Sequence, residues 1–206
     1  MSVRRLAVGV GPEVFEFTPE NIEWAHKEVT KYPEGRQQSA VIALLDRAQR
    51  QSGGWLPEAA VRYVSDFLDM PYIKTYEVAT FYTMFNLNPV GEHHIQLCGT
   101  TPCWLRGADD LKEVCRSKMG VDKEAGVSAD GKFSWAEVEC LGACVNAPMI
   151  QIGDDFYEDL TPETLAKLLD DLAAGREIKA GPQINRQLSA PEGGPKTLLE
   201  LEGGDA

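Results

Sequence analysis

The sequence predicts an α+β protein: a small helical bundle followed by an α/β sandwich. Apolar residues recur at helical spacing through residues 18–90, whereas short β-type runs alternate with helical stretches through residues 91–176. Neither pattern continues into residues 177–206, which hold three prolines and five glycines and are expected to form an extended tail. Residues 1–17 form an amino-terminal extension. With 43% hydrophobic residues among 206, each part can bury a core.

Four short helices are predicted in the first part. The first begins at Thr18-Pro19-Glu20, which combines a capping hydroxyl, a proline at the first helical position and an acidic first turn, and it ends at Tyr32-Pro33. The break Ser52-Gly53-Gly54 separates the second helix from the third. The three later helices cover about residues 36–51, 57–70 and 75–85. Short helices with short connections predict a small bundle.

The second part changes to shorter runs. A helix with an apolar stripe from Leu111 to Met119 lies between the first two predicted strands. A hairpin turns at Gly153-Asp154-Asp155, and a last helix follows it, capped by Thr161-Pro162-Glu163 and stopped at Gly175. The order β-α-β-β-β-α, with a βαβ unit first, favours a thioredoxin-like sandwich. The four predicted strands are residues 94–97, 133–139, 149–152 and 156–158.

Four of the five cysteines form two pairs. Cys98 and Cys103 are separated by four residues, Cys140 and Cys144 by three, and 36 residues lie between the pairs. Each pair follows a predicted strand directly. If those two strands are neighbours in the sheet, both loops lie at the same end and the four thiolates can converge. Such a set suits either a [2Fe–2S] cluster or a tetrahedral zinc ion.

The residues between the cysteines favour iron and sulfur over zinc. Residues 99–102 and 141–143 are small or uncharged, so their backbone N–H groups are free to point at sulfides. Structural zinc sites prefer C-x2-C knuckles, which leaves zinc as the alternative. A thiol oxidoreductase would need C-x-x-C, which is absent. Disulfides are disfavoured because we expect a cytosolic chain: the amino terminus lacks the apolar run of a secretory signal.

The remaining cysteine and the histidines are not expected to be ligands. Cys115 lies on the apolar stripe of a predicted helix, where a buried small hydrophobic residue is the simplest interpretation. A Rieske centre would need each histidine paired closely with a ligand cysteine, and the sequence does not provide that arrangement. We therefore expect His26, His93 and His94 to lie on the surface.

Charge and composition exclude several classes of function. A net charge of −12 would repel DNA or RNA, whose binding needs clustered Lys and Arg. No run approaches the roughly 20 apolar residues of a membrane-spanning helix, so membrane insertion is not expected. The dinucleotide fingerprint G-x-G-x-x-G is also absent. If NADH is involved, a different polypeptide must bind it.

Three runs closely resemble the thioredoxin-like [2Fe–2S] subunits of respiratory complex I, which in bacteria are the E subunits of NADH–quinone oxidoreductase. They are Tyr76–Phe85, Cys98-Gly-Thr-Thr-Pro-Cys103 and Glu139-Cys-Leu-Gly-Ala-Cys144-Val-Asn-Ala-Pro148, and the resemblance extends from about Phe17 to Pro182. It implies that Cys98, Cys103, Cys140 and Cys144 ligate one [2Fe–2S] cluster.

The resemblance also implies a place in a larger enzyme. The family docks on a flavin subunit that binds FMN and NADH, next to other iron–sulfur subunits, and its cluster exchanges one electron with the flavin. The chain would not be catalytic alone. It would be peripheral on the cytoplasmic face of the bacterial inner membrane. Related chains serve NAD-linked hydrogenases and formate dehydrogenases, which are the alternative assignment.

Overall fold

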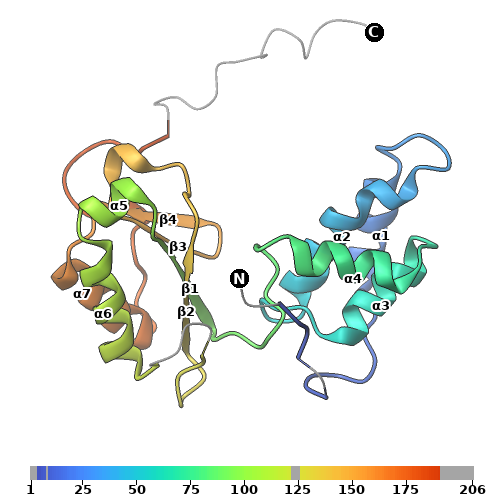
Figure 1. Ribbon diagram of the computed structural model, residues 1–206, viewed down its shortest axis with the longest axis horizontal. Helices are drawn as coiled ribbons and strands as arrows, with labels where there is room; N and C mark the ends of the chain where they lie inside the picture. Colours follow the sequence, from blue (N-terminus) through green and yellow to red (C-terminus); the bar gives the residue numbers. More distant parts are fainter. Residues whose placement is uncertain (1–3, 8, 122–125, 191–206) are drawn as a thin grey trace, which may run out of the picture. The chain divides into compact units, whose positions relative to one another are not determined.

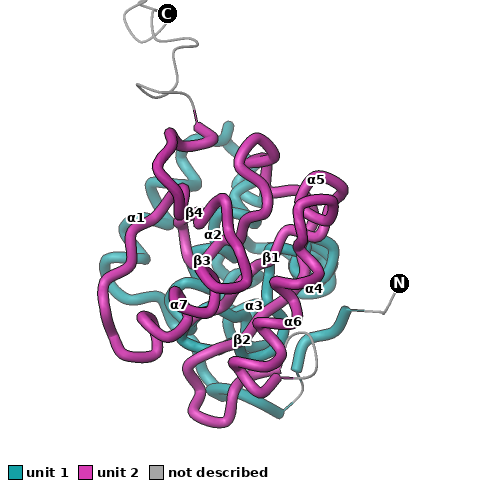
Figure 2. The backbone as a smooth tube through the Cα atoms, turned by 90° about the vertical axis from the view of Figure 1, so that its left-hand side faces the viewer, with its two compact units in different colours: residues 1–92 teal, residues 93–206 magenta. Residues whose placement is uncertain are grey.

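The computed structural model describes residues 4–7, 9–121 and 126–190 (Figure 1). The chain forms two compact units, residues 1–92 and residues 93–206 (Figure 2). Each unit has its own hydrophobic core. The predicted tail beyond residue 190 lies outside the described residues. The predicted α+β class, with helices first and a thioredoxin-like sheet second, is confirmed.

The first unit is the predicted helical bundle. Thr18 caps its first helix as expected, since its hydroxyl accepts from the N–H of Asn21 at 3.3 Å. Fully buried Leu44, Leu45 and Val61 lie in its core. The helices are α1 (Pro19–Val29), α2 (Val41–Gln51), α3 (Glu58–Phe67) and α4 (Tyr72–Phe81), with a 3₁₀ turn η1 (Gln37–Ala40) before α2.

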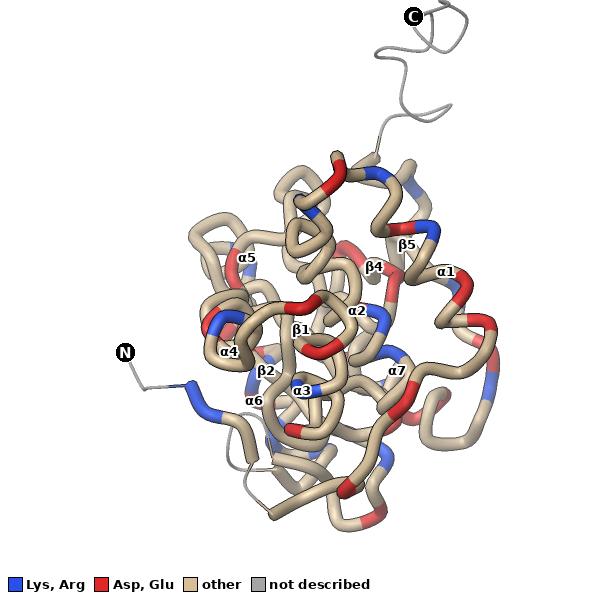
Figure 3. The backbone as a smooth tube through the Cα atoms, turned by 90° about the vertical axis from the view of Figure 1, so that its right-hand side faces the viewer, with Lys and Arg blue, Asp and Glu red and all other residues tan. Residues whose placement is uncertain are grey.

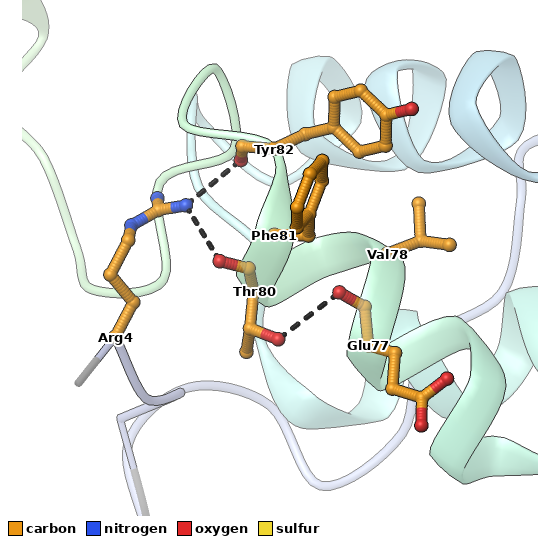
Figure 4. Close-up of a pocket in the computed structure, with 6 residues that line it drawn as sticks. All are labelled: Arg4, Glu77, Val78, Thr80, Phe81 and Tyr82. Carbon is orange, nitrogen blue, oxygen red and sulfur yellow. Dashed lines mark hydrogen bonds between the residues drawn. The ribbon is translucent and has the colours of Figure 1, made fainter.

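The fourth helix lies earlier in the chain than the sequence predicts. It starts directly after Pro71, whose extended backbone precedes the first turn, and ends at Phe81 rather than Phe85. Tyr82 is already extended. The guanidinium of Arg4 donates to the carbonyls of Thr80 at 3.1 Å and Tyr82 at 2.9 Å (Figure 4), and also to that of Phe85. This contact with a distant arginine takes acceptors that a longer helix would have used.

The second unit holds a five-stranded sheet in the order β2-β1-β3-β4-β5. β1 is parallel to β2 and antiparallel to β3, and β4 is parallel to β5. The strands are β1 (His93–Cys98), β2 (Phe133–Val138), β3 (Ile150–Ile152), β4 (Asp155–Glu158) and β5 (Gly181–Pro182). The helices are α5 (Thr101–Leu105), α6 (Ala108–Met119) and α7 (Pro162–Ala173), with a 3₁₀ turn η2 (Cys144–Asn146).

Helices α6 and α7 pack beside each other on one face of this sheet (Figure 1). The predicted cap of α7 is present, because Thr161 and Thr164 form a reciprocal capping box. Leu111 of α6 and Leu165 of α7 are fully buried against the strands.

Besides the 3₁₀ turn η2, one helix and one strand of this unit were not predicted. The first is the short helix α5, which lies between the first two cysteines. The second is β5, in which Gly181 pairs with Tyr157 and Pro182 with Glu158. The segment expected to be an extended tail therefore begins by completing the sheet.

Among the described residues, no helix is long and apolar enough to cross a membrane. Lys and Arg are scattered among Asp and Glu along the backbone (Figure 3).

Candidate metal centre

The two cysteine pairs lie at one edge of the sheet. Cys98 is the last residue of β1 and is in register with Val138, the last residue of the parallel strand β2. Cys103 follows in α5, Cys140 in the loop after β2, and Cys144 at the start of η2. The carboxyl ends of neighbouring parallel strands share one edge, so the expectation that both loops meet there is confirmed.

The sulfur atoms form two close pairs. The Sγ atoms of Cys140 and Cys144 are 3.4 Å apart. Cys98 and Cys103 are close enough for each thiol to shift the pKa of the other. The two pairs also interact electrostatically, because negative charge on Cys98 disfavours ionisation of both Cys140 and Cys144. All of these cysteines are free thiols. The structure thus places the four cysteines that the sequence singled out at one end of the sheet, as two pairs.

Hydrogen-bond donors lie close to these sulfur atoms. The hydroxyl of Thr100 lies 3.4 Å from Cys98 Sγ, a contact that sequence reasoning did not anticipate. Gly142 has a positive φ of 86°, which suits glycine and lets its N–H reach Cys140. Hydrogen bonds to sulfur are one of the factors that set the potential of an iron–sulfur cluster. The backbone donors are Thr100 and Leu141 to Cys98, Met149 to Cys103, and Gly142 to Cys140.

The thiols differ in acidity because their surroundings differ. Burial pushes the pKa of Cys98 upward, but hydrogen bonds from Thr100, Leu141 and Cys103 outweigh it and lower the pKa. Burial raises the pKa of Cys103 to about 12, and the neighbouring Cys98 adds to the effect.

The two thiols of the second pair, Cys140 and Cys144, also differ in pKa. The N–H of Gly142, followed by the thiol of Cys144, lowers the pKa of Cys140. Donating to Cys140 raises the pKa of Cys144. In each pair, therefore, one thiol has a lowered pKa and its neighbour a raised pKa. Binding a metal through thiolates would release the protons of these thiols.

The site has an inner and an outer side. Cys98 and Cys103 are buried, whereas Cys140 and Cys144 are exposed. The residues that directly follow the two second cysteines are apolar and exposed: Trp104 by 55% and Val145 by 67%. A group held here would be anchored in the core on one side and accessible to a partner on the other.

Acidic side chains border the site. A cleft of about 390 Å³ is lined by Gly99, Thr100, Glu137, Val138 and Glu139. Lys112 lies 2.9 Å from Glu137 and partly balances this charge, whereas Glu139 is exposed beside Cys140. Negative charge beside a metal cluster disfavours adding an electron, so these carboxylates would lower the potential of a cluster held at this site.

Cys115 is fully buried, as the sequence predicts, and burial raises its pKa to about 12. The expectation of three surface histidines is wrong for His94. Its side chain is only partly exposed, with Nδ1 2.8 Å from Ser134 Oγ, and burial lowers its pKa to about 4. The cause is strand register, because His94 lies directly opposite the fully buried Ser134.

The donor set fits a [2Fe–2S] cluster. Such clusters are held by four cysteine thiolates, and the structure offers four free thiols in two pairs with N–H donors directed at them. Within the described residues, no group of three or more His, Cys, Asp or Glu side chains is arranged to hold one metal ion. The thiols are paired rather than grouped around one centre.

A thioredoxin-like sheet with four cysteines at the end of its first strand and in the segments that follow its first two strands defines a thioredoxin-like iron–sulfur protein. The chain belongs to the family of thioredoxin-like [2Fe–2S] ferredoxins, which it matches over residues 25–173.

Within this family, the chain is similar to E subunits of NADH-quinone oxidoreductase, which confirms the resemblance seen in the sequence. The chain is 54% identical to an E subunit of NADH-quinone oxidoreductase from Rhizobium meliloti (strain 1021), over 98% of its own length and 74% of that relative. It is 57% identical to the E subunit of NADH-quinone oxidoreductase from Rickettsia bellii (strain RML369-C), over 77% of its length and 94% of the relative.

A solved structure shares the fold. An NAD+-reducing [NiFe]-hydrogenase in the H2-reduced state matches 67% of this chain with a TM-score of 0.59 and 18% identity. The match covers 23% of the hydrogenase chain, so the fold occurs there as part of a much longer polypeptide.

Proposed function

We propose that this chain is the electron-transfer subunit of the NADH-oxidising module of NADH–quinone oxidoreductase, and that Cys98, Cys103, Cys140 and Cys144 hold its [2Fe–2S] cluster. One observation carries the proposal: four free thiols lie in two pairs at the carboxyl ends of two neighbouring parallel strands, with backbone N–H groups directed at them. Relatives more than 50% identical to the chain bear the name of that enzyme's E subunit, which supports the assignment.

The buried and the exposed cysteines have different roles in this proposal. When bound, a [2Fe–2S] cluster supplies one-electron chemistry, here exchanged with FMN on a partner flavin subunit that also binds NADH. Buried Cys98 and Cys103 fix the ligand set to the core. Exposed Cys140 and Cys144 face outward, and the apolar Trp104 and Val145 beside them suit a covering protein surface that keeps water away.

The chain's place in the cell follows from this assignment. It would dock on the flavin subunit and neighbouring iron–sulfur subunits, as a peripheral part of the complex on the cytoplasmic face of the membrane. An equivalent subunit of an NAD-linked hydrogenase or formate dehydrogenase is the second assignment. Its support is limited to fold similarity at 18% identity, well below the identity to the NADH-quinone oxidoreductase relatives.

A pair of serine substitutions tests the ligand assignment. Cys140→Ser removes a thiolate from the edge, so we expect loss of stoichiometric iron and sulfide and of the visible spectrum. Cys115→Ser is the matched control, because Cys115 is fully buried within α6 and is not one of the paired thiols. Equal loss of iron in both variants would refute the ligand set.

A second measurement tests the electron partner. NADH should reduce the metal centre of wild-type protein only when the flavin subunit of the complex is present, as followed by electron paramagnetic resonance. Reduction by NADH of the isolated chain would contradict the assignment of NADH binding to the partner. So would the absence of reduction in the assembled module.

A further inference from the structure

A buried glutamate side chain is hydrogen-bonded to the loop that carries Cys144. Glu158, at the end of β4, is 1% exposed. Its Oε2 accepts from Asn146 Nδ2 at 2.6 Å and from the N–H of Ser189 at 3.1 Å, and its Oε1 accepts from the Ser189 hydroxyl. These donors are neutral, so hydrogen bonds balance the cost of burying this side chain.

One of these donors belongs to the cysteine loop. Asn146 is the last residue of η2, which begins at Cys144. Its own N–H donates to the carbonyl of Ala143 at 3.0 Å, and its carbonyl accepts from the N–H of Asp159 at 2.8 Å. The backbone just before Cys144 is thereby bonded to Asn146, and Asn146 is bonded in turn to Asp159 through its carbonyl and to Glu158 through its side chain.

The other residue that donates to Glu158 is Ser189, which belongs to residues 183–190, here called the carboxyl-terminal strap. The N–H of Gln183 donates to the Glu158 carbonyl at 2.9 Å, and Arg186 pairs with Asp159 at 3.3 Å. The Gln187 carbonyl accepts a second bond from Asn146 Nδ2 at 3.0 Å. The strap therefore reaches the cysteine loop both directly and through Glu158.

We infer that Glu158 is a positioning residue for the metal centre: it latches the carboxyl-terminal strap to the loop that carries Cys144, and the latch slows loss of the cluster. The inference rests on the proposed function, because it takes Cys144 as a ligand. Cys140 and Cys144 are the exposed ligands, so release must begin with opening of their loop. Opening it requires breaking the bonds to Glu158, which makes the open state less populated.

The test uses the full-length chain with its cluster assembled under anaerobic conditions. Loss of visible absorbance in excess EDTA gives the release rate. Glu158→Leu keeps the volume but removes every acceptor, and we expect release about tenfold faster. Glu158→Gln retains a carbonyl oxygen for Asn146 and the Ser189 N–H, and its amide can donate to the Ser189 hydroxyl. We expect release within about twofold of wild type.

Leu168→Ala is the control for general destabilisation. Leu168 is buried in α7, and its truncation weakens the same core without touching the latch. We expect little change in release rate at temperatures where this variant remains folded. Ser189→Ala removes only the hydroxyl donor and should speed release about threefold. It keeps the test available if the leucine variant does not fold.

The outcomes separate the inference from the proposed function. Wild-type release rates in both Glu158→Leu and Ser189→Ala would overturn the latch. Acceleration by Leu168→Ala equal to that by Glu158→Leu would do the same, because it would show a merely structural effect. A wild-type chain that takes up no [2Fe–2S] cluster would instead overturn the proposed function, and the inference with it.

Discussion

His94 makes the stability of the second unit depend on pH. It lies in β1 with Nδ1 2.8 Å from Ser134 Oγ, and burial lowers its pKa from 6.5 to about 4. Because the folded-state pKa is below the unfolded value, the fold favours the neutral imidazole. Its contribution to stability is fully present above pH 6.5 and is lost as the pH falls toward 4.

The size of this effect follows from the two pKa values. The difference between 6.5 and about 4 corresponds to about 3 kcal/mol when the loss is complete. By about pH 5.5 the loss relative to about pH 8 is roughly 1.4 kcal/mol. Other groups also titrate in this range, so the His94 contribution must be isolated by substitution.

Urea unfolding of wild type and His94→Gln at both pH values isolates it. Glutamine can keep a hydrogen bond to Ser134 but does not titrate, so wild type should lose about 1.4 kcal/mol more than the variant between about pH 8 and about pH 5.5. A titration of the His94 ring by NMR checks the pKa directly. Equal losses in the two proteins, or a ring that titrates near 6.5, would refute the reasoning.

Three further substitutions test other parts of the fold by urea unfolding. Gly142→Ala puts a side chain at a φ of 86°, where left-handed backbone costs about 1–2 kcal/mol, although the space around it is open. Arg4→Ala removes the guanidinium that donates to the end of α4 (Figure 4), and should cost about 1 kcal/mol and speed hydrogen exchange there. Leu165→Ala empties a fully buried position in the second core and should cost about 2–5 kcal/mol.

Each of these variants has its own contradicting result. An unfolding free energy unchanged by Gly142→Ala would show that the loop adopts another backbone conformation. Exchange at the end of α4 unaffected by Arg4→Ala would show that the carbonyls have other partners. A cost below about 1 kcal/mol for Leu165→Ala would mean that the core collapses around the vacated volume.

The sequence is most informative where the pattern is local. Thr18 and Thr161 cap their helices as predicted, because capping depends on residues within one turn. The convergence of the cysteine loops is also predictable, since it follows once the two strands are parallel neighbours. The structure adds the hydrogen-bond donors around the sulfurs and the division into buried and exposed thiols.

The parts that could not be predicted depend on distant residues. The end of α4 depends on Arg4, whose guanidinium donates to the carbonyl of Thr80, 76 residues away in the chain. β5 consists of two residues and exists through pairing with β4, so it leaves no periodic pattern. The burial of His94 depends on which residue the neighbouring strand places opposite it. Glu158 belongs to the same class, because only tertiary structure joins it to Asn146 and Ser189.

The most direct test of the central claim is the metal content of the anaerobically purified full-length chain, measured together with its electron paramagnetic resonance spectrum after dithionite reduction. A chain that holds one [2Fe–2S] cluster should contain two irons and two acid-labile sulfides, with a low-temperature signal from one reduced spin. One zinc per chain without a signal, unchanged by anaerobic reconstitution with iron and sulfide, would contradict it. The four thiols would then form a structural zinc site rather than an electron carrier.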